Sequence, residues 1–136
     1  MILIANFRPP AMKFVVEFPA GLLEDTNYEE NARREMLEET GYEVEKFEEI
    51  PLPPIYCDPW KSNESGLLYL ATINGDDPKS KKEQNLDGEE NIKVLTVPFD
   101  ENLMKTVDEL VKKNGYIVES KVWSICLGLW MSKLIK

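Results

Sequence analysis

Short runs of apolar, β-branched and aromatic residues recur along the chain, and several of them end at a proline. Such runs predict buried or half-buried strands. We expect five strands, at residues 2–7, 13–18, 42–47, 67–73 and 92–97. Pro9, Pro19 and Pro98 follow three of these runs, and proline ends a strand because it lacks the N–H group that a strand ladder needs.

The clearest helix pattern lies between the second and third expected strands. Thr26 or Asn27 can cap this helix, because a glutamate follows either residue at the third position and completes a capping box. We expect the helix over residues 28–40, with Gly41 as a left-handed stop. Two amphipathic segments predict further helices over residues 103–112 and 118–135.

The remaining segments read as connections. Residues 50–58 contain three prolines and predict an irregular connector, and the polar residues 75–90 predict a mobile loop. The order of strands and helices is mixed, which predicts an α/β (α+β) fold: an α/β/α sandwich around a mixed sheet. A length of 136 residues without a linker predicts a single domain over residues 1–136.

Charge and composition narrow the chemistry. With 25 acidic and 16 basic residues the net charge is −9, so we expect no nucleic-acid partner. The chain has no histidine, which excludes Ser-His-Asp and Cys-His catalysis and histidine-bound zinc. Cys57 and Cys126 predict two buried thiols. The apolar stretch 125–131 is too short to cross a bilayer, and no secretory signal is visible. We therefore expect a soluble cytoplasmic protein, with the nucleus as the alternative compartment, and no membrane partner.

Carboxylates crowd one face of the first expected helix. Glu35, Glu38 and Glu39 are spaced i, i+3 and i+4, so they lie within one turn of each other and repel. A cation would relieve this repulsion, and carboxylate oxygens favour Mg²⁺ or Mn²⁺. The alternative is a solvated acidic helix face, which the triple alone favours.

The segment Arg34-Glu35-Met36-Leu37-Glu38-Glu39-Thr40-Gly41-Tyr42 resembles the Nudix hydrolases. Their signature is G-x5-E-x7-R-E-U-x-E-E-x-G-U, where U is a bulky apolar residue, and the second half matches at every fixed position. The first half departs from it. Twelve residues separate Gly21 from Arg34, where the signature has thirteen, and its first glutamate falls on Thr26 or Asn27.

The resemblance narrows to the ADP-sugar (ADP-ribose) pyrophosphatase branch. The segments that are similar to this branch are residues 7–10, 17–21, 58–64, 73–77 and 87–90. Trp60 stands where the branch commonly has glycine.

The resemblance implies a metal site. Its Mg²⁺ ligands would be the carboxylates of Glu35, Glu38 and Glu39 and the carbonyl of Ala20, with Mn²⁺ as the alternative ion. Arg34 would pair with a helix carboxylate and hold it in place.

The resemblance also implies substrate contacts and a base. The substrate-binding residues would be Arg8, Leu22, Asp58 and Glu64, with Arg8 on the diphosphate. The activating base would be Glu90 if the distance to Pro98 is kept, or Glu89 if the Asp-Gly-Glu triplet is kept. We prefer Glu90.

The activity that the resemblance implies is Mg²⁺-dependent hydrolysis of ADP-ribose or a related ADP-sugar to AMP and a sugar phosphate. Relatives usually carry an N-terminal β-module that swaps across a dimer, and we expect this module to be absent here. The apolar C-terminal helices still favour a homodimer. The alternatives are a non-catalytic Nudix-fold module that binds a nucleotide or a protein, and a Nudix enzyme for other, oxidised nucleoside diphosphates.

Overall fold

The computed structural model describes residues 1–48 and 53–135. Its centre is a four-stranded sheet with the order β7-β1-β2-β8. The strands are β1 (Ile2–Arg8), β2 (Lys13–Glu17), β7 (Ile92–Thr96) and β8 (Ile117–Val118). β1 is antiparallel to both β2 and β7, whereas β8 runs parallel to β2, so the sheet is mixed.

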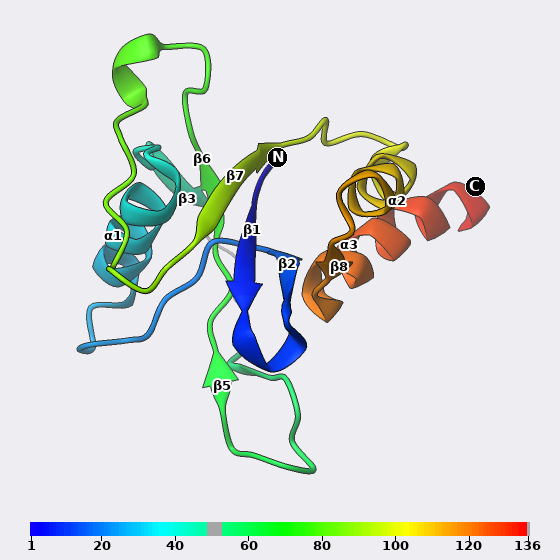
Figure 1. Ribbon diagram of the computed structural model, residues 1–136, viewed down its shortest axis with the longest axis horizontal. Coiled ribbons are helices and arrows are strands. Elements are labelled where there is room, and N and C mark those ends of the chain that lie inside the picture. Colours follow the sequence, from blue (N-terminus) through cyan, green and yellow to red (C-terminus); the bar gives the residue numbers. More distant parts are fainter. Residues whose placement is uncertain (49–52, 136) are drawn as a thin grey trace.

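Helices cover both faces of this sheet (Figure 1). Helix α1 (Tyr28–Thr40) lies on one side. Helices α2 (Leu103–Asn114) and α3 (Ser120–Met131) lie on the other, and short 3-10 turns occupy Pro9–Ala11, Pro78–Ser80 and Ser132–Ile135. The prediction of an α/β/α sandwich around a mixed sheet is confirmed.

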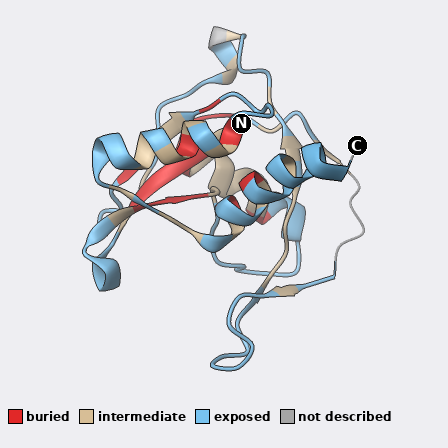
Figure 2. Cartoon of the chain, turned by 90° about the vertical axis from the view of Figure 1, so that its right-hand side faces the viewer, coloured by how far each residue is buried: buried red, intermediate tan, exposed pale blue. Residues whose placement is uncertain are grey.

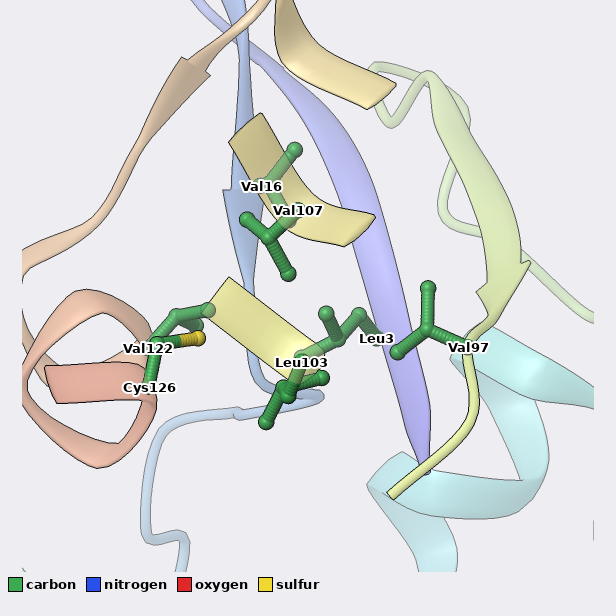
Figure 3. Close-up of a cluster of buried hydrophobic side chains, with 7 residues drawn as sticks. All are labelled: Leu3, Val16, Val97, Leu103, Val107, Val122 and Cys126. Atoms are coloured by element: carbon green, nitrogen blue, oxygen red, sulfur yellow. The ribbon is translucent and has the colours of Figure 1, made fainter. Parts of the chain in front are cut away.

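The hydrophobic core fills the space between the sheet and α2 and α3. Buried residues gather on the central strands and on the helix faces that meet them (Figure 2). The cluster comprises Leu3, Val16, Val97, Leu103, Val107, Val122 and Cys126 (Figure 3). Because successive strand residues point to opposite faces, Leu3 enters this core while Ile4 faces the other side, together with its partner Glu17.

Two expected strands are shorter than predicted. In the run 42–47 only residues 46–47 form a strand, as part of β3 (Lys46–Glu48), and in the run 67–73 only β6 (Leu70–Thr72) does. β3 and β6 pair with each other outside the main sheet. Tyr42 forms only an isolated bridge to Lys81. A second ribbon pairs β4 (Ile55–Tyr56) with β5 (Ser65–Gly66), so the predicted connector 50–58 contains a strand; its residues 50–52 lie outside the described part.

Helix α1 begins and ends where the sequence predicts. Asn27 is the N-cap, and its side chain accepts a hydrogen bond from the Glu30 N–H. The Asn27 N–H donates a hydrogen bond to Asp25 Oδ1 at 2.7 Å. In a capping box a helix glutamate would accept this hydrogen bond. Gly41 ends the helix with a left-handed φ of 75°.

Three other expectations need correction. The C-terminal helix begins at Ser120 and gives way to a 3-10 turn after Met131, and Val118 belongs to a strand. The segment 75–90 is not a plain loop, since it contains the 3-10 turn at Pro78–Ser80 and bonds to the end of α1 through the Lys82 N–H and the Gly41 carbonyl. Cys57 is exposed, and only Cys126 is buried. Among the described residues, no helix is long and apolar enough to cross a bilayer.

Candidate active site

Glu39 is the buried acid of the candidate site. It lies in the last turn of α1 and is only 3% exposed. Its Oε2 accepts a hydrogen bond from the Ala20 N–H at 2.9 Å, which ties the turn after β2 to the helix. Burial raises the pKa of Glu39 to about 7, and the charges of Glu35 and Glu90 act in the same direction. A buried acid that faces two other acids is a strong attractor for a cation.

Glu35 lies one turn before Glu39 and against Gly21. A Cβ atom on Gly21 would lie 1.8–2.4 Å from the side-chain atoms of Glu35, so any larger residue would displace the carboxylate. Burial raises the pKa of Glu35, and the neighbouring Arg34 opposes the shift. Gly21 is therefore needed for the close approach of the turn to the helix, independently of any positive φ.

Arg34 holds the other two helix carboxylates. Its Nη1 donates to Glu38 Oε2 at 2.8 Å, and its Nη2 donates to Glu35 Oε1 at 2.9 Å. A third ion pair joins Nη2 to Glu24 Oε1 at 3.3 Å. One guanidinium thus balances part of the acidic charge that the helix spacing brings together.

Glu90 acts by its charge on the same carboxylates from a distant part of the chain. The segment that leads into β7 passes along α1, where the Asn85 N–H donates to the Glu38 carbonyl (Figure 1). The Glu90 carboxylate accepts a hydrogen bond from the Asp87 N–H at 3.0 Å, and its charge contributes to the raised pKa of both Glu35 and Glu39. Glu89 and Glu90 are both exposed, but no ion pair or side-chain hydrogen bond joins Glu89 to another described residue.

Arg8 is bonded to one acid and feels the charge of two others. Its Nε and Nη2 donate to the two oxygens of Glu17 at 2.8 and 2.6 Å, in the bidentate geometry typical of arginine and a carboxylate. This bond to Glu17 is the main reason that the pKa of Arg8 is raised, and the charges of Glu39 and Glu90 add to it. Sequence reasoning did not assign Glu17 a role, although an acid that shares a strand face with buried Val15 is a signal of a fixed ion pair.

The remaining predicted substrate residues lie on exposed loops. Leu22 follows Gly21 and is 85% exposed. Asp58 and Glu64 lie in the loop between β4 and β5, where the Asp58 carbonyl accepts hydrogen bonds from the backbone of Lys61 and Ser62. In the described part of the chain no hydrogen bond or ion pair joins these three side chains to the carboxylates of α1. The loop carries a shallow hollow of about 470 Å³, lined by Tyr56, Pro59, Trp60, Lys61, Ser62 and Asn63.

The donor chemistry of the site fits a hard divalent cation, although its side chains are not gathered around one point. Within residues 1–48 and 53–135, no three His, Cys, Asp or Glu side chains are grouped closely enough to hold a metal ion. The reason is visible in the ion pairs, because Glu35 and Glu38 both bind Arg34 while Glu39 binds the Ala20 amide. All the available donors are oxygens, which suits Mg²⁺ or Mn²⁺ better than a soft metal.

Comparisons with known proteins show the family of the chain. The NUDIX domain family matches residues 1–119. The chain is 36% identical over 131 residues to a Mus musculus protein named ADP-sugar pyrophosphatase, covering 95% of this chain and 59% of the relative. It is 30% identical over 137 residues to a Saccharomyces cerevisiae ADP-ribose pyrophosphatase, covering 98% and 57%. It is 34% identical over 107 residues to a Cronobacter sakazakii GDP-mannose pyrophosphatase, covering 79% and 53%. The chain therefore spans between 53% and 59% of the length of these relatives.

Proposed function

This chain belongs to the Nudix family, and we propose that it hydrolyses the diphosphate bond of ADP-ribose or a related ADP-sugar. The products are AMP and a sugar phosphate. One observation carries the proposal: Glu39, buried at the end of α1, is bonded to the Ala20 N–H and is repelled by the charges of Glu35 and of Glu90 from the segment before β7. Glu35 packs against Gly21, and the charges of Glu39 and Glu90 act on Arg8.

A second candidate substrate is a sugar nucleotide with another base. The similarity to a GDP-mannose pyrophosphatase over 79% of the chain favours it. The chemistry at the diphosphate is the same in both cases, so the two candidates differ only in the groups that contact the base and the sugar.

Nudix hydrolases generally use divalent metal ions. We assign the ligands here to Glu35, Glu38, Glu39 and the carbonyl of Ala20, with Mg²⁺ as the ion and Mn²⁺ as the alternative. Bound by these residues, such ions would neutralise the diphosphate oxygens and lower the pKa of a bound water. Arg34 positions Glu35 and Glu38 through its two hydrogen bonds.

The other assigned residues act on the substrate and the water. Arg8 binds the diphosphate, and Glu90 accepts a proton from the water that attacks phosphorus. A new P–O bond forms to this water, and the bridging P–O bond breaks with its electron pair leaving on the departing phosphate. We assign the sugar and nucleoside contacts to Leu22, Asp58 and Glu64.

We also propose that the protein forms a homodimer. Helix α3 exposes Trp123, Leu127 and Trp130 on its surface, each about two-fifths exposed. Tryptophan is enriched in protein interfaces, so a second copy is the partner that this face fits best.

The test of the proposed function is release of AMP from ADP-ribose in the presence of Mg²⁺, with GDP-mannose and oxidised nucleoside diphosphates assayed in parallel. Turnover that requires the metal and is lost in Glu39→Gln supports the proposal. A protein that binds nucleotides without metal-dependent turnover of any of these substrates is instead a non-catalytic module. Turnover that survives Glu39→Gln would mean that the ions bind elsewhere.

The two candidate bases give a separate prediction. Glu90→Gln should slow turnover by about 10²–10⁴-fold, the usual contribution of a general base, because the charge of Glu90 is among those that raise the pKa of Glu35 and Glu39. Glu89→Gln is the matched control, with a change of less than about threefold. The opposite ranking would assign the base to Glu89.

A further inference from the structure

We propose that Glu17 is a positioning residue that keeps Arg8 away from Glu39 and Glu90. By holding the Arg8 guanidinium, Glu17 leaves the carboxylates of Glu39 and Glu90 free for divalent cations. It also leaves one nitrogen of Arg8, Nη1, available to a diphosphate. This inference rests on the proposed function for its purpose, although the restraint itself can be measured without any substrate.

The geometry of the β1–β2 hairpin shows how the restraint works. Arg8 is paired across the hairpin with Lys13, whereas Glu17 is paired with Ile4. Directly opposite residues lie on the same face of the sheet, so Arg8 and Glu17 share a face but are separated along it. The Arg8 side chain therefore folds back along β1 to reach Glu17, and this bond fixes its direction.

Burial identifies Glu17 as the fixed end of the pair. The Glu17 side chain is 11% exposed and the Arg8 side chain is 49% exposed. Nε and Nη2 of Arg8 are occupied by the Glu17 carboxylate. The Nη1 group has no protein partner among the described residues, so it remains available for phosphate oxygens.

Without Glu17, the charges around Arg8 would be unbalanced. The remaining acids that attract its guanidinium are Glu39 and Glu90, whose charges already stabilise the protonated arginine and raise its pKa. At the buried Glu39 carboxylate the attraction between unit charges is several times stronger than in bulk water. Arg8 would turn onto these two carboxylates and compete there with a divalent cation.

The test measures Mn²⁺ affinity by electron paramagnetic resonance in the absence of substrate. The proteins are the wild type, Glu17→Gln, Arg8→Gln and the double variant of both positions. Glu17→Gln should weaken Mn²⁺ binding by about tenfold or more, within the usual effect of a residue that orients a metal site. The double variant should return to within about threefold of Arg8→Gln, because no guanidinium is left to invade the site.

This rescue separates positioning from a purely structural role. A structural role for Glu17 would lower Mn²⁺ affinity whether or not Arg8 is present. Asp108→Asn is the control, since Asp108 is also an acid bonded to a cation, Lys112, and lies on α2, on the other side of the sheet from α1. It should leave Mn²⁺ affinity unchanged. If Glu17→Gln fails to fold, the double variant still reports, because it removes both charges and leaves neither unpaired.

The outcomes are distinct. Equal Mn²⁺ affinity in the wild type and Glu17→Gln would overturn the inference. A double variant that binds Mn²⁺ as weakly as Glu17→Gln would also overturn it. If Glu17→Gln does not fold, a double variant that binds Mn²⁺ much more weakly than Arg8→Gln would overturn it instead. A wild type that binds no Mn²⁺ would overturn both this inference and the proposed function. Rescue of Mn²⁺ binding in a protein that hydrolyses no sugar nucleotide would support the restraint and overturn the proposed function alone.

Discussion

Replacing Glu39 by glutamine should stabilise the metal-free protein at alkaline pH. Glu39 is buried, and its pKa is raised to about 7 by burial and by the charges of Glu35 and Glu90. Glutamine has nearly the same shape, and its side-chain oxygen can still accept the hydrogen bond from the Ala20 N–H. The substitution therefore removes the charge and keeps the packing.

The pH dependence follows from proton binding. The folded protein holds the Glu39 proton up to about pH 7, whereas an ordinary glutamate in the unfolded chain releases it near 4.5. The folded state binds more protons between these values, so the stability from this group is complete below about 4.5 and is lost as pH rises through about 7. The gap corresponds to about 3 kcal/mol, at about 1.4 kcal/mol for each pH unit.

The assay is urea unfolding in the presence of a chelator, from pH 5 to pH 8. Wild type and Glu39→Gln should have similar free energies of unfolding at pH 5, and the variant should be more stable by up to about 3 kcal/mol at pH 8. Glu29→Gln, an exposed residue in the first turn of the same helix, is the control and should show no such divergence. Adding Mg²⁺ at pH 8 should stabilise the wild type more than the variant.

One result would refute this reasoning. If Glu39→Gln follows the wild type at every pH, or is less stable at pH 8, then the Glu39 carboxylate does not carry a destabilising charge. The cation would then have no electrostatic reason to bind next to it.

Two glycine substitutions test the close contacts around α1. Gly21→Ala should weaken Mn²⁺ binding and turnover by roughly tenfold with little loss of stability, because its Cβ would displace the flexible Glu35 carboxylate; unchanged metal affinity would contradict the close approach. Gly41→Ala should instead lower the free energy of unfolding by more than about 2 kcal/mol, since φ is positive and the Cβ would lie 2.1 Å from the Lys82 carbonyl oxygen. Gly75→Ala, where no atom lies within 4 Å of the added Cβ, is the control for both in metal titration and thermal unfolding.

Helix α1 could be predicted closely because its signals are local. The cap at Asn27 and the stop at Gly41 depend on residues within one turn of each end. Even here one detail was wrong, because Asp25 rather than a helix glutamate bonds the Asn27 N–H. Two competing acids near one amide cannot be ranked from spacing alone.

The strands outside the main sheet were predicted less well because pairing is not local. The apolar runs 42–47 and 67–73 are intrinsically suited to strands, yet only three residues of each ribbon strand find a partner. β8 has two residues and therefore no pattern of its own. It exists because the connection from α2 to α3 passes beside β2.

In the candidate site, too, local features could be predicted and tertiary contacts could not. Helical spacing predicts that Glu35, Glu38 and Glu39 crowd together, but it does not tell which of them is buried. The tertiary structure decides this, because Arg34 draws Glu35 and Glu38 to itself while the Ala20 amide takes Glu39.

The contacts of Glu17 and the charge effects of Glu90 illustrate what only the folded chain reveals. Neither residue lies on α1. Glu17 is bonded to Arg8, on which the charge of Glu39 acts, and Glu90 acts on Glu39 through its own charge. Acids that pair with an arginine and acids that face one another have the same composition in the sequence. They differ in whether a positively charged side chain of the protein already neutralises them. Neither Arg8 nor Arg34 is bonded to Glu39, so Glu39 is the acid of the site that is best suited to a divalent ion.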